Sequence, residues 1–408
     1  MEEKLIVIVG AGFGGITVAL KLEKKLRRFP AYHIVLIDKN AYQLYTPALY
    51  EIAAIPREEA SASVLKPIII IPVEEIVARR RIRFLQEEVI KIDREKSIIS
   101  LKDGKNLSFT FLVLALGSET NYFNIPGLKE HSYPLKQFED AIRIRNRIEK
   151  MVAEKSILNI IVGGAGAAGV ELISELANFI CYLQQKVLTT HTCANRLILI
   201  EASATVLPGI DQWTVERATE RLRALGIEIK TATRIAQVEA THVITDDHKR
   251  ISCDLLVWTG GVTGNSFSTS LGLPLTRKNN LAVNEFLEAQ KNIFVVGDGA
   301  GFIDKGTGQL LPWTVPIAEA EGKIIAKNIA RIISDKPKIP FTPLRHYPYI
   351  LTIGKKYALA NLIVMHLKGF PGWLIKIFVE LRYLLFILPM IKAFRIWWKG
   401  VRIYSSND

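Results

Sequence analysis

The chain alternates short apolar runs with longer amphipathic stretches, which is the pattern of parallel strands covered by helices. The first apolar run is Leu5–Val9, and it leads into the glycine-rich turn Gly10–Gly15. From Ile16 to Leu26 the apolar residues recur at helical spacing. A second strand is predicted over His33–Ile37, and it ends in Asp38. The N-terminal part is therefore predicted to fold as strand, turn, helix and strand.

The glycines of this turn have the spacing of a dinucleotide-binding site. Gly10 permits the tight turn, Gly12 lets the backbone approach a pyrophosphate, and Gly15 lets the helix and the strand pack closely. The helix N-terminus offers free N–H groups and the positive end of its dipole to the phosphates. Asp38 is the acid expected to bind an adenosine ribose hydroxyl. Glycine spacing alone is weak evidence, but the complete order of elements predicts that this unit binds a dinucleotide.

The whole pattern occurs a second time. The apolar run Leu158–Val162 precedes a glycine-rich turn, a helix is predicted from Val170, and the later strand Arg196–Ile200 ends in Glu201. The second turn keeps the spacing of the first, with Gly164, Gly166 and Gly169. Two dinucleotides are expected, and the simplest chemistry for such a pair is hydride transfer from a nicotinamide to a flavin. Glu201 would accept a hydrogen bond from a 2′-hydroxyl and repel a 2′-phosphate, which favours NADH over NADPH.

Further runs complete an α/β fold with two Rossmann-type dinucleotide-binding domains. Asp103–Gly104 predicts a hairpin turn, Asn124–Gly127 a hinge, and Phe138–Val152 an amphipathic helix, while Leu176–Val187 extends the second helix. Asp298 lies just beyond a strand end, where a carboxylate can accept hydrogen bonds from ribityl hydroxyls. The remaining strand predictions are Ile82–Leu85, Ile98–Leu101, Phe111–Gly117, Ile227–Ile229, Val243–Ile244, Asp254–Gly261, Leu281–Asn284 and Ile293–Ala300.

Composition agrees with a globular chain of two to three domains. Of its 408 residues 49% are hydrophobic, which excludes a disordered protein. Two glutamates and Lys4 directly precede the first strand, so no signal peptide is expected and the chain is expected to stay in the cytoplasm. The cysteines have no CxxC or zinc-ligand spacing, so we expect no metal site and buried thiols in a reducing compartment. These cysteines are Cys181, Cys193 and Cys253.

With these motifs in order, the chain resembles the type II NADH:quinone oxidoreductases, single-subunit flavoproteins of the two-dinucleotide-binding-domain superfamily. The resemblance runs nearly end to end. Disulfide reductases and sulfide:quinone oxidoreductases fit less well, because the cysteine pairs that they need beside the flavin are missing. The stretches that carry the resemblance are Asp38–Glu51, Leu114–Ser118, Ile125–Leu128, Gly163–Glu171, Glu201–Pro208, Trp258–Asn265, Val296–Ala300 and Tyr349–Gly354.

The resemblance implies FAD in the first unit, NADH in the second and membrane attachment by the C-terminus. The expected domains are an FAD-binding domain of residues 1–125 and 283–340, an NADH-binding domain of residues 126–282 and a C-terminal region of residues 341–408. The expected cofactor-binding residues are Gly10, Gly12, Phe13, Gly14, Gly15, Asp38, Lys39, Tyr45, Thr46, Ala115, Gly117, Gly164, Gly166, Gly169, Glu201, Gly261, Gly297, Asp298, Val315 and Pro316.

Two residues are expected to take part in catalysis. In the family, a glutamate at the place of Glu171 lies between nicotinamide and flavin and is linked to proton supply. The alternative is a carboxylate in the first helical turn that the helix dipole stabilises. Lys376 matches a family lysine near the quinone, and the alternative is a solvated lysine or one that faces lipid phosphates.

One departure from the family concerns the quinone pocket. The family usually has two glutamines one turn apart at the start of the helix beside the flavin, and Pro316 and Ala320 replace them here. The chain therefore lacks two amide groups that would orient a quinone carbonyl.

The C-terminal segment is basic and amphipathic. From Leu344 to the end it carries +8 of the chain's net +13. Lys376, Glu380 and Arg382 interrupt its longest apolar stretch and Pro389 splits it, so a spanning helix is not expected. Apolar residues at helical spacing are Phe370, Trp373, Leu374, Ile377, Phe378 and Leu381, then Ile391, Phe394, Trp398 and Val401. The opposite face of the second run is Lys392, Arg395, Lys399 and Arg402.

Basic amphipathic helices with Trp at the boundary are typical of segments that lie in a membrane interface. The alternative is a helical cap packed on the protein's own core or on a second subunit. No groove-reading motif accompanies the charge, so nucleic acid is not an expected partner.

The sequence thus predicts a respiratory enzyme on the cytoplasmic face of the cell membrane, in which NADH reduces FAD and FAD reduces a membrane quinone without proton pumping. Two alternatives stay open: the same dehydrogenase with a non-quinone acceptor, and a non-enzymatic flavoprotein that senses NADH. A homodimer is possible.

Overall fold

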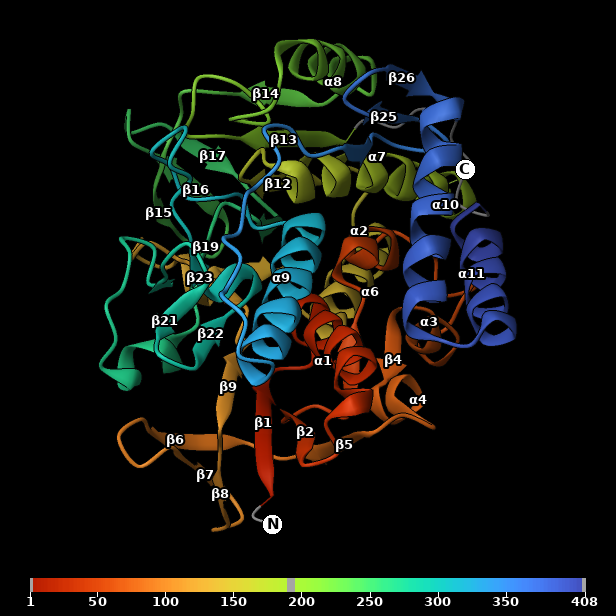
Figure 1. Ribbon diagram of the computed structural model, residues 1–408. Coiled ribbons are helices and arrows are strands. Elements are labelled where there is room, and N and C mark those ends of the chain that lie inside the picture. The colour runs from red at the N-terminus through yellow and green to blue at the C-terminus, as the bar shows by residue number, and fades with distance from the viewer. Residues whose placement is uncertain (1–2, 189–194, 406–408) are drawn as a thin grey trace. The chain divides into compact units, whose positions relative to one another are not determined.

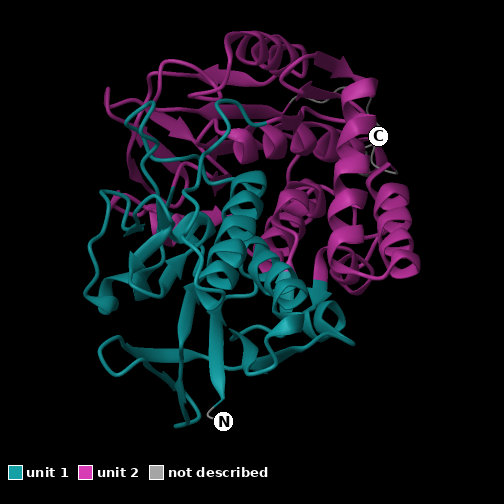
Figure 2. Ribbon diagram, viewed as in Figure 1, with its two compact units in different colours: residues 1–43, 71–119, 262–347 teal, residues 44–70, 120–261, 348–408 magenta. Residues whose placement is uncertain are grey.

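The computed structural model describes residues 3–188 and 195–405, which form two compact units (Figure 2). Unit 1 comprises residues 1–43, 71–119 and 262–347, and unit 2 comprises residues 44–70, 120–261 and 348–408. This division differs from the expected domains, because residues 44–70 and the C-terminal segment both belong to unit 2. The cause is packing. Helix α3 (Ala62–Ile69) of residues 44–70 contacts α11 (Met390–Tyr404) of the C-terminal segment. Helix α2 (Leu49–Ile52) contacts helices α6 (Phe138–Glu154) and α7 (Ala167–Leu188) of the second dinucleotide-binding fold. Which cofactor each unit binds stays a prediction.

Unit 1 is built on a six-stranded sheet in the order β21-β22-β9-β1-β2-β5 (Figure 1). Its strands pair in parallel except β21, which runs antiparallel to β22. Strand β1 is apolar along most of its length because helices cover both faces of a sheet of this type, and Ile6, Val7 and Ile8 are fully buried. The strands are β1 (Lys4–Val9), β2 (Tyr32–Asp38), β5 (Ile82–Gln86), β9 (Phe111–Leu114), β21 (Glu288–Gln290) and β22 (Ile293–Val295).

Helices α1 (Phe13–Lys25) and α9 (Val315–Ile333) pack closely in unit 1 (Figure 1). Gly322 permits the approach, since a Cβ there would lie 3.0 Å from Thr17 Cβ and 3.1 Å from Gly14 O. Helix α1 begins three residues before the predicted Ile16, because the backbone of Gly12 is extended (φ −77°, ψ −172°) and the helix starts directly after it.

The rest of unit 1 consists of a small antiparallel sheet, short strands and short helices. Strands β6 (Val89–Asp93), β7 (Ile98–Leu101) and β8 (Asn106–Ser108) form an antiparallel sheet, and the predicted hairpin at Asp103–Gly104 joins the last two. The others are α4 (Val73–Val77), β19 (Val262–Gly264), β20 (Leu281–Ala282), β23 (Ala300–Gly301), and the short 3₁₀ helices η1 (Leu26–Arg28), η3 (Ser266–Leu271) and η4 (Gly297–Gly299). Strands β3 (Tyr42–Leu44), β4 (Ile70–Pro72) and β10 (Ser118–Thr120) cross the unit boundaries.

Unit 2 contains the second Rossmann fold, a parallel sheet in the order β11-β18-β12-β13-β14. Helix α7 (Ala167–Leu188) follows β12 and again starts three residues before the predicted Val170, directly after the middle glycine of its turn. The strands are β11 (Ser132–Pro134), β12 (Asn159–Gly163), β13 (Arg196–Ile200), β14 (Glu228–Lys230) and β18 (Leu255–Trp258). Other elements are α2 (Leu49–Ile52), α3 (Ala62–Ile69), α5 (Leu128–His131), α6 (Phe138–Glu154), α8 (Gln212–Ala224), β15 (Ile235–Val238), β16 (His242–Thr245), β17 (Arg250–Ser252) and the 3₁₀ helix η2 (Thr46–Ala48).

The C-terminal segment adds an antiparallel sheet and two helices to unit 2. Strands β24 (Tyr349–Thr352), β25 (Ala358–Asn361) and β26 (His366–Gly369) form the sheet. This sheet was not predicted, because its four-residue strands have little apolar alternation. The predicted helices are confirmed as α10 (Phe370–Ile387) and α11 (Met390–Tyr404), with the break at Pro389.

The predicted apolar runs of these two helices have different surroundings. On α10, Trp373, Ile377 and Leu381 are buried inside unit 2, whereas Phe370 and Phe378 are exposed, so only part of this apolar run belongs to the protein core. On α11, Ile391 is 76% exposed and Trp398 is 58% exposed. No helix in residues 3–188 and 195–405 is both long and apolar enough to span a bilayer.

The cysteines agree only in part with the expected buried thiols. Cys253 is buried and free, and desolvation raises the pKa of its thiol to about 12. Cys181 is disulfide-bonded, so the expectation of a free thiol is wrong at this residue. Cys193 lies outside the described residues.

Candidate functional site

The two glycine-rich turns have matching geometry at their first glycines. Gly10 and Gly164 both have a positive φ, of +108° and +98°. A Cβ on Gly10 would lie 2.2 Å from Ala115 O, and one on Gly164 would lie 2.3 Å from Gly260 Cα. Both the backbone conformation and the neighbouring chain therefore require glycine here.

The other two glycines of each turn match as well. A Cβ on Gly15 or on Gly169 would lie 1.9 Å from the carbonyl oxygen of the first glycine of the same turn. At the middle positions, Gly12 and Gly166, a Cβ would meet no protein atom within 4 Å. Each turn therefore leaves open space at a helix N-terminus, which fits a pyrophosphate group.

The acids that end β2 and β13 are held against these turns. Asp38 accepts hydrogen bonds from the backbone N–H groups of Ala11 (2.7 Å) and Asn40 (2.8 Å), and desolvation raises the pKa of its carboxyl. Glu201 makes the equivalent bonds with Ala165 (2.7 Å) and Ser203 (2.8 Å). Both carboxylates are thus fixed beside the turn, where the ribose of a bound dinucleotide is expected.

The turn Gly297–Asp298 is held from three directions in unit 1. Asp298 Oδ2 accepts a hydrogen bond from Ser118 Oγ (2.5 Å), and its backbone carbonyl accepts one from Asn280 Nδ2 (2.5 Å). The Gly297 N–H donates to Glu321 Oε2 of α9 (2.7 Å). Glu321 is buried, and desolvation raises the pKa of its carboxyl to about 8. Sequence reasoning missed Glu321, although an acid on the buried face of an amphipathic helix is a recognisable signal.

Glu171 lies in the second turn of α7, because this helix begins earlier than predicted. Its Oε1 accepts a hydrogen bond from the backbone N–H of Thr352 (3.3 Å), and the Thr352 hydroxyl accepts one from Tyr50 (3.0 Å). Desolvation raises the pKa of the Glu171 carboxyl to about 8. The alternative of a first-turn carboxylate stabilised by the helix dipole is therefore wrong, and the group is suited to hold and release a proton near neutral pH.

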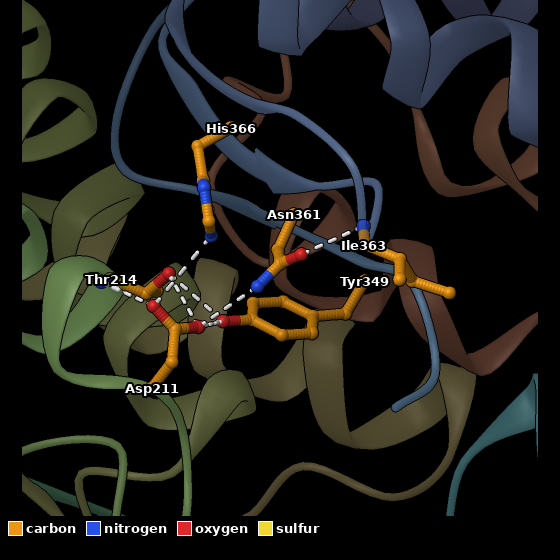
Figure 3. Close-up of polar contacts among 6 residues, drawn as sticks. All are labelled: Asp211, Thr214, Tyr349, Asn361, Ile363 and His366. Carbon is orange, nitrogen blue, oxygen red and sulfur yellow. Dashed lines mark hydrogen bonds and ion pairs between the residues drawn. The ribbon is translucent and has the colours of Figure 1, made fainter. Parts of the chain in front are cut away.

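Strand β24, which carries Thr352, is tied at its other end to α8 (Figure 3). The Tyr349 hydroxyl donates a hydrogen bond to Asp211, which also caps α8 by accepting from Thr214 N (3.1 Å). Asn361 Nδ2 donates to the same carboxylate (3.1 Å), and His366 Nε2 lies 4.0 Å from it. This cluster was not found from the sequence, because its members come from four separate elements, α8, β24, β25 and β26.

Lys376 is largely shielded from solvent, with 16% of its side chain exposed, and it forms an ion pair with Glu51 of α2. The alternative of a solvated or lipid-facing lysine is therefore wrong. Desolvation lowers the pKa of Lys376, but the negative charges of Glu51 and Glu380 outweigh this and raise it. Lys376 lowers the pKa of Glu171 and Glu51 raises it. The structure thus brings the two predicted catalytic residues into one electrostatic environment of unit 2.

The other expected cofactor residues of unit 1 lie close to the first turn or to α9. Phe13 and Gly14 are the first residues of α1, and a Cβ on Gly14 would lie 2.7 Å from Val296 Cγ2. Lys39 follows Asp38 and is exposed. Ala115 contacts the first glycine of the turn, and Gly117 has a φ of +70°. Helix α9 begins with Val315 and Pro316, and Pro316 is exposed.

Three further expected cofactor residues, besides those of the second turn and its acid, belong to unit 2. The ring centroid of Tyr45 lies 5.6 Å from that of Tyr383 on α10. Thr46 begins η2 and is exposed. Gly261 lies against Phe123, since a Cβ there would be 2.5 Å from the Phe123 ring. Among the described residues, no group of three or more His, Cys, Asp and Glu side chains is placed to hold a metal ion.

Comparison with known proteins identifies relatives over most of the chain. Residues 4–322 match the family described as pyridine nucleotide-disulphide oxidoreductase. The chain is 31% identical over 350 residues to the type II NADH:quinone oxidoreductase of Staphylococcus aureus, covering 82% of this chain and 83% of that protein.

Two solved structures show the same fold. NDH2 from Plasmodium falciparum in complex with NADH has a TM-score of 0.83 at 18% identity, over 98% of both chains. The sulfide:quinone oxidoreductase of Aquifex aeolicus has a TM-score of 0.77 at 19% identity, over 94% of this chain and 90% of that one. At these identities the likeness concerns the fold alone.

Proposed function

This chain belongs to the pyridine nucleotide-disulphide oxidoreductase family and, within it, to the type II NADH:quinone oxidoreductases, and from this we propose that it oxidises NADH through bound FAD and passes the electrons to a membrane quinone. The observation that carries the proposal is the repeated geometry of the two glycine turns, each with an open middle glycine and a fixed acid. Two such sites in one chain suit two dinucleotides that react with each other.

The turn of unit 1 would hold FAD. Gly10, Gly12 and Gly15 would shape the pyrophosphate site, Asp38 would bind the adenosine ribose, and Asp298 would accept hydrogen bonds from the ribityl chain. FAD, when bound, takes two electrons from the nicotinamide and passes them on, so the reacting atoms belong to the cofactors. What the protein supplies is position, charge and protons.

The turn of unit 2 would hold NADH, and the similar structure of NDH2 from Plasmodium falciparum is a complex with NADH. Gly164, Gly166 and Gly169 would bind its pyrophosphate, and Glu201 would accept a hydrogen bond from the ribose 2′-hydroxyl. Because both oxygens of Glu201 already accept backbone N–H groups, the carboxylate cannot turn away from a 2′-phosphate. NADPH should therefore bind less well.

Quinone is the proposed acceptor, as the name of the Staphylococcus relative suggests. Glu171 and Lys376 are the residues proposed to handle protons, since both are partly buried and the charge of Lys376 acts on the Glu171 carboxyl. Pro316 and Ala320 stand where the family has two glutamines of the quinone pocket, and their loss should weaken quinone binding. We therefore expect the flavin to be reduced by NADH faster than quinone reoxidises it.

Helix α11 supports the proposed location on the cytoplasmic face of the cell membrane. It exposes Ile391, Phe394 and Trp398, and its basic residues suit anionic lipid headgroups. A homodimer stays a prediction that analytical ultracentrifugation tests.

A stopped-flow experiment tests the function directly. Purified protein is mixed without oxygen first with NADH and then with a short-chain quinone, while the flavin absorbance is followed. We expect bleaching by NADH and recovery with quinone. Flavin that stays reduced under excess quinone but recovers with ferricyanide would support the non-quinone acceptor instead. Failure of NADH to bleach the flavin would contradict the dehydrogenase assignment altogether.

A further inference from the structure

Unit 2 buries more ionisable groups around Lys376 than one ion pair requires. Glu380 lies one helical turn beyond Lys376 on α10 and is 3% exposed. Glu51 of α2 is buried and paired with Lys376. Tyr404 of α11 is 6% exposed, and Lys376 Nζ lies 5.2 Å from the centroid of its ring. Three helices therefore enclose two carboxyl groups and one ammonium group.

Helix α11 closes over the Glu380 carboxyl at a glycine. A Cβ on Gly400 would lie 3.7 Å from Glu380 Oε1, 3.3 Å from Tyr404 Cε2 and 3.1 Å from Ile68 Cγ2. The glycine thus lets α11 come close enough to cover the carboxyl. The Tyr404 hydroxyl is buried here and has no hydrogen-bond partner among the described residues.

The charges of this cluster favour one stored proton. If Glu51, Glu380 and Lys376 were all ionised, the cluster would hold a net negative charge away from water, which is unfavourable. The ion pair with Lys376 favours the ionised form of Glu51, so we place the proton on Glu380. Desolvation raises the pKa of Glu380 to about 7, Lys376 acting against the rise and Glu51 adding to it.

The other titratable groups that act on this cluster include two tyrosines and two charged residues. Burial raises the pKa of Tyr404 and of Tyr45 well above the usual tyrosine value, so neither loses its proton near pH 7. Arg382 acts on Tyr45, and Glu175 of α7 acts on Lys376. Two carboxyl groups coupled to Lys376, those of Glu171 and Glu380, are therefore suited to give up a proton near neutral pH, and Glu380 is the one on the same helix, one turn from Lys376.

We propose that Glu380 stores the proton that Lys376 delivers to the quinone, which makes it a further proton-transfer residue of the reaction. The proposal rests on the proposed function. Oxidation of NADH by a quinone converts NADH, one proton and quinone into NAD⁺ and quinol. NADH supplies two electrons and one proton, and the solvent supplies the second proton. Lys376 gives that proton to a quinone oxygen, the Glu380 carboxyl restores the ammonium group of Lys376, and the Glu380 carboxylate is reprotonated from the solvent.

A purely structural role predicts something different. Packing α10 against α2 and α11 needs no second carboxyl, and an uncharged side chain of the same shape would avoid the cost of burying it. Glu380→Gln keeps the shape and removes the titration, whereas Glu380→Asp keeps the titration and shortens the side chain. A structural role makes Gln the better substitute, and a proton-transfer role makes Asp the better one.

The experiment uses the full-length, FAD-loaded protein and both variants, with Glu288→Gln as the matched control. Glu288 is another buried, ion-paired glutamate, and it lies in unit 1 beside Lys338. Stopped flow measures flavin reduction by NADH and reoxidation by a short-chain quinone across pH. Infrared titration follows the absorption of protonated carboxyl groups in the same samples.

We expect Glu380→Gln to keep the rate of flavin reduction and to lose about tenfold or more in reoxidation at neutral pH. Its reoxidation should no longer fall as pH rises through about 7, and its infrared titration should lack one carboxyl. Glu380→Asp should reoxidise faster than Glu380→Gln, and Glu288→Gln should behave as the wild type. Three outcomes would overturn this inference but leave the proposed function standing. They are reoxidation of Glu380→Gln at the wild-type rate and pH profile, an unchanged infrared titration in Glu380→Gln, and faster reoxidation of Glu380→Gln than of Glu380→Asp. A wild type that no quinone reoxidises overturns the proposed function and this inference with it.

Discussion

Tyr349 on β24 donates a hydrogen bond to Asp211, the residue that caps the N-terminus of α8. Three residues along the same strand, Thr352 donates its backbone N–H to Glu171. A second bond from α8, Arg221 Nε to the carbonyl of Ile353 (3.2 Å), holds the far end of the strand. The strand is thus clamped to one helix at both ends, with the Glu171 contact close to the second clamp.

Replacing Tyr349 with Phe should therefore change the titration of Glu171. The Thr352 N–H lowers the pKa of the Glu171 carboxyl, so a looser strand lets that pKa rise further above about 8. The loss of a hydrogen bond to a charged group should also cost about 1.5–3 kcal/mol of unfolding free energy. Infrared titration and chemical denaturation measure the two effects. Tyr357→Phe, which changes a tyrosine near the same sheet, is the control, and equal effects of both variants would contradict the clamp.

Glu201 should set the preference for NADH. The wild type should reduce its flavin with NADH at least several-fold more efficiently than with NADPH at low concentration, since a close charge repulsion is worth about 1 kcal/mol or more. Glu201→Gln keeps an acceptor for the ribose and removes the charge, so the preference should shrink towards unity. Glu228→Gln, on the neighbouring strand and ion-paired with Arg196, should leave the ratio unchanged. Equal rates with both cofactors in the wild type would argue against this role.

These two sites differ in how far the sequence could predict them. The glycine turns, their strands and the acids Asp38 and Glu201 were predictable, because each lies within a short stretch whose local geometry fixes its chemistry. The start of each helix was placed three residues late, since the first helical residues after Gly12 and Gly166 have the same composition as a turn. The surroundings of Glu171 were not predictable, because Thr352 reaches it from 181 residues away.

The C-terminal helices show a second limit of sequence reasoning. Apolar residues at helical spacing indicate a face that avoids water but do not say what covers it. On α10 the protein itself covers only part of the face, since Trp373 and Ile377 are buried but Phe378 is exposed, and on α11 much of the face is exposed. The sequence also left a solvated Lys376 as an alternative, because its partner Glu51 is 325 residues away along the chain.

The exposed residues of α11 should carry membrane binding. The double variant Ile391→Gln and Trp398→Gln should bind anionic vesicles at least about tenfold more weakly, because two large apolar side chains no longer enter the interface. Its FAD content should be unchanged. Ile303→Gln in unit 1, where Ile303 is 54% exposed, is the matched control. Vesicle sedimentation measures the affinity, and full binding by the double variant would assign these residues to another contact.

Glu321 should make the protein less stable at alkaline pH. Its folded pKa of about 8 lies above the ordinary value of 4.5, so the folded state binds the proton more tightly and stability is lost as pH rises from about 4.5 through about 8. Glu321→Gln removes this dependence and can still accept from Gly297. Above pH 8 the variant should be more stable than the wild type, on the order of 1–3 kcal/mol, and should show no such gain near pH 4. Denaturation across pH tests this, with Glu319→Gln on the same helix for comparison; a pH-independent difference would contradict it.

Restoring the two glutamines should speed electron transfer to quinone. Pro316 lies in the first turn of α9, where no backbone N–H is needed within the helix, so Gln is compatible with the helix start. Two lost hydrogen bonds weaken quinone binding by roughly tenfold to a hundredfold, and Pro316→Gln with Ala320→Gln should recover part of this. Flavin reduction by NADH should not change, and stopped flow resolves both steps. If reoxidation is no faster in the double variant, the glutamines do not limit the acceptor step.

The interleaving of the two units along the chain has a consequence for synthesis on the ribosome. Strand β9 is exposed along one edge until β22, more than 170 residues later, has been made and can pair with it. Helix α1 likewise waits for α9 and its Gly322. An N-terminal domain usually folds before the next domain is translated. Unit 1 of this protein cannot do so, because its sheet needs a strand that is made later. An unpaired apolar edge persists while more than 170 residues are synthesised and is prone to wrong pairing. Yield in cells should therefore depend on chaperone capacity more than the stability of the finished fold would suggest.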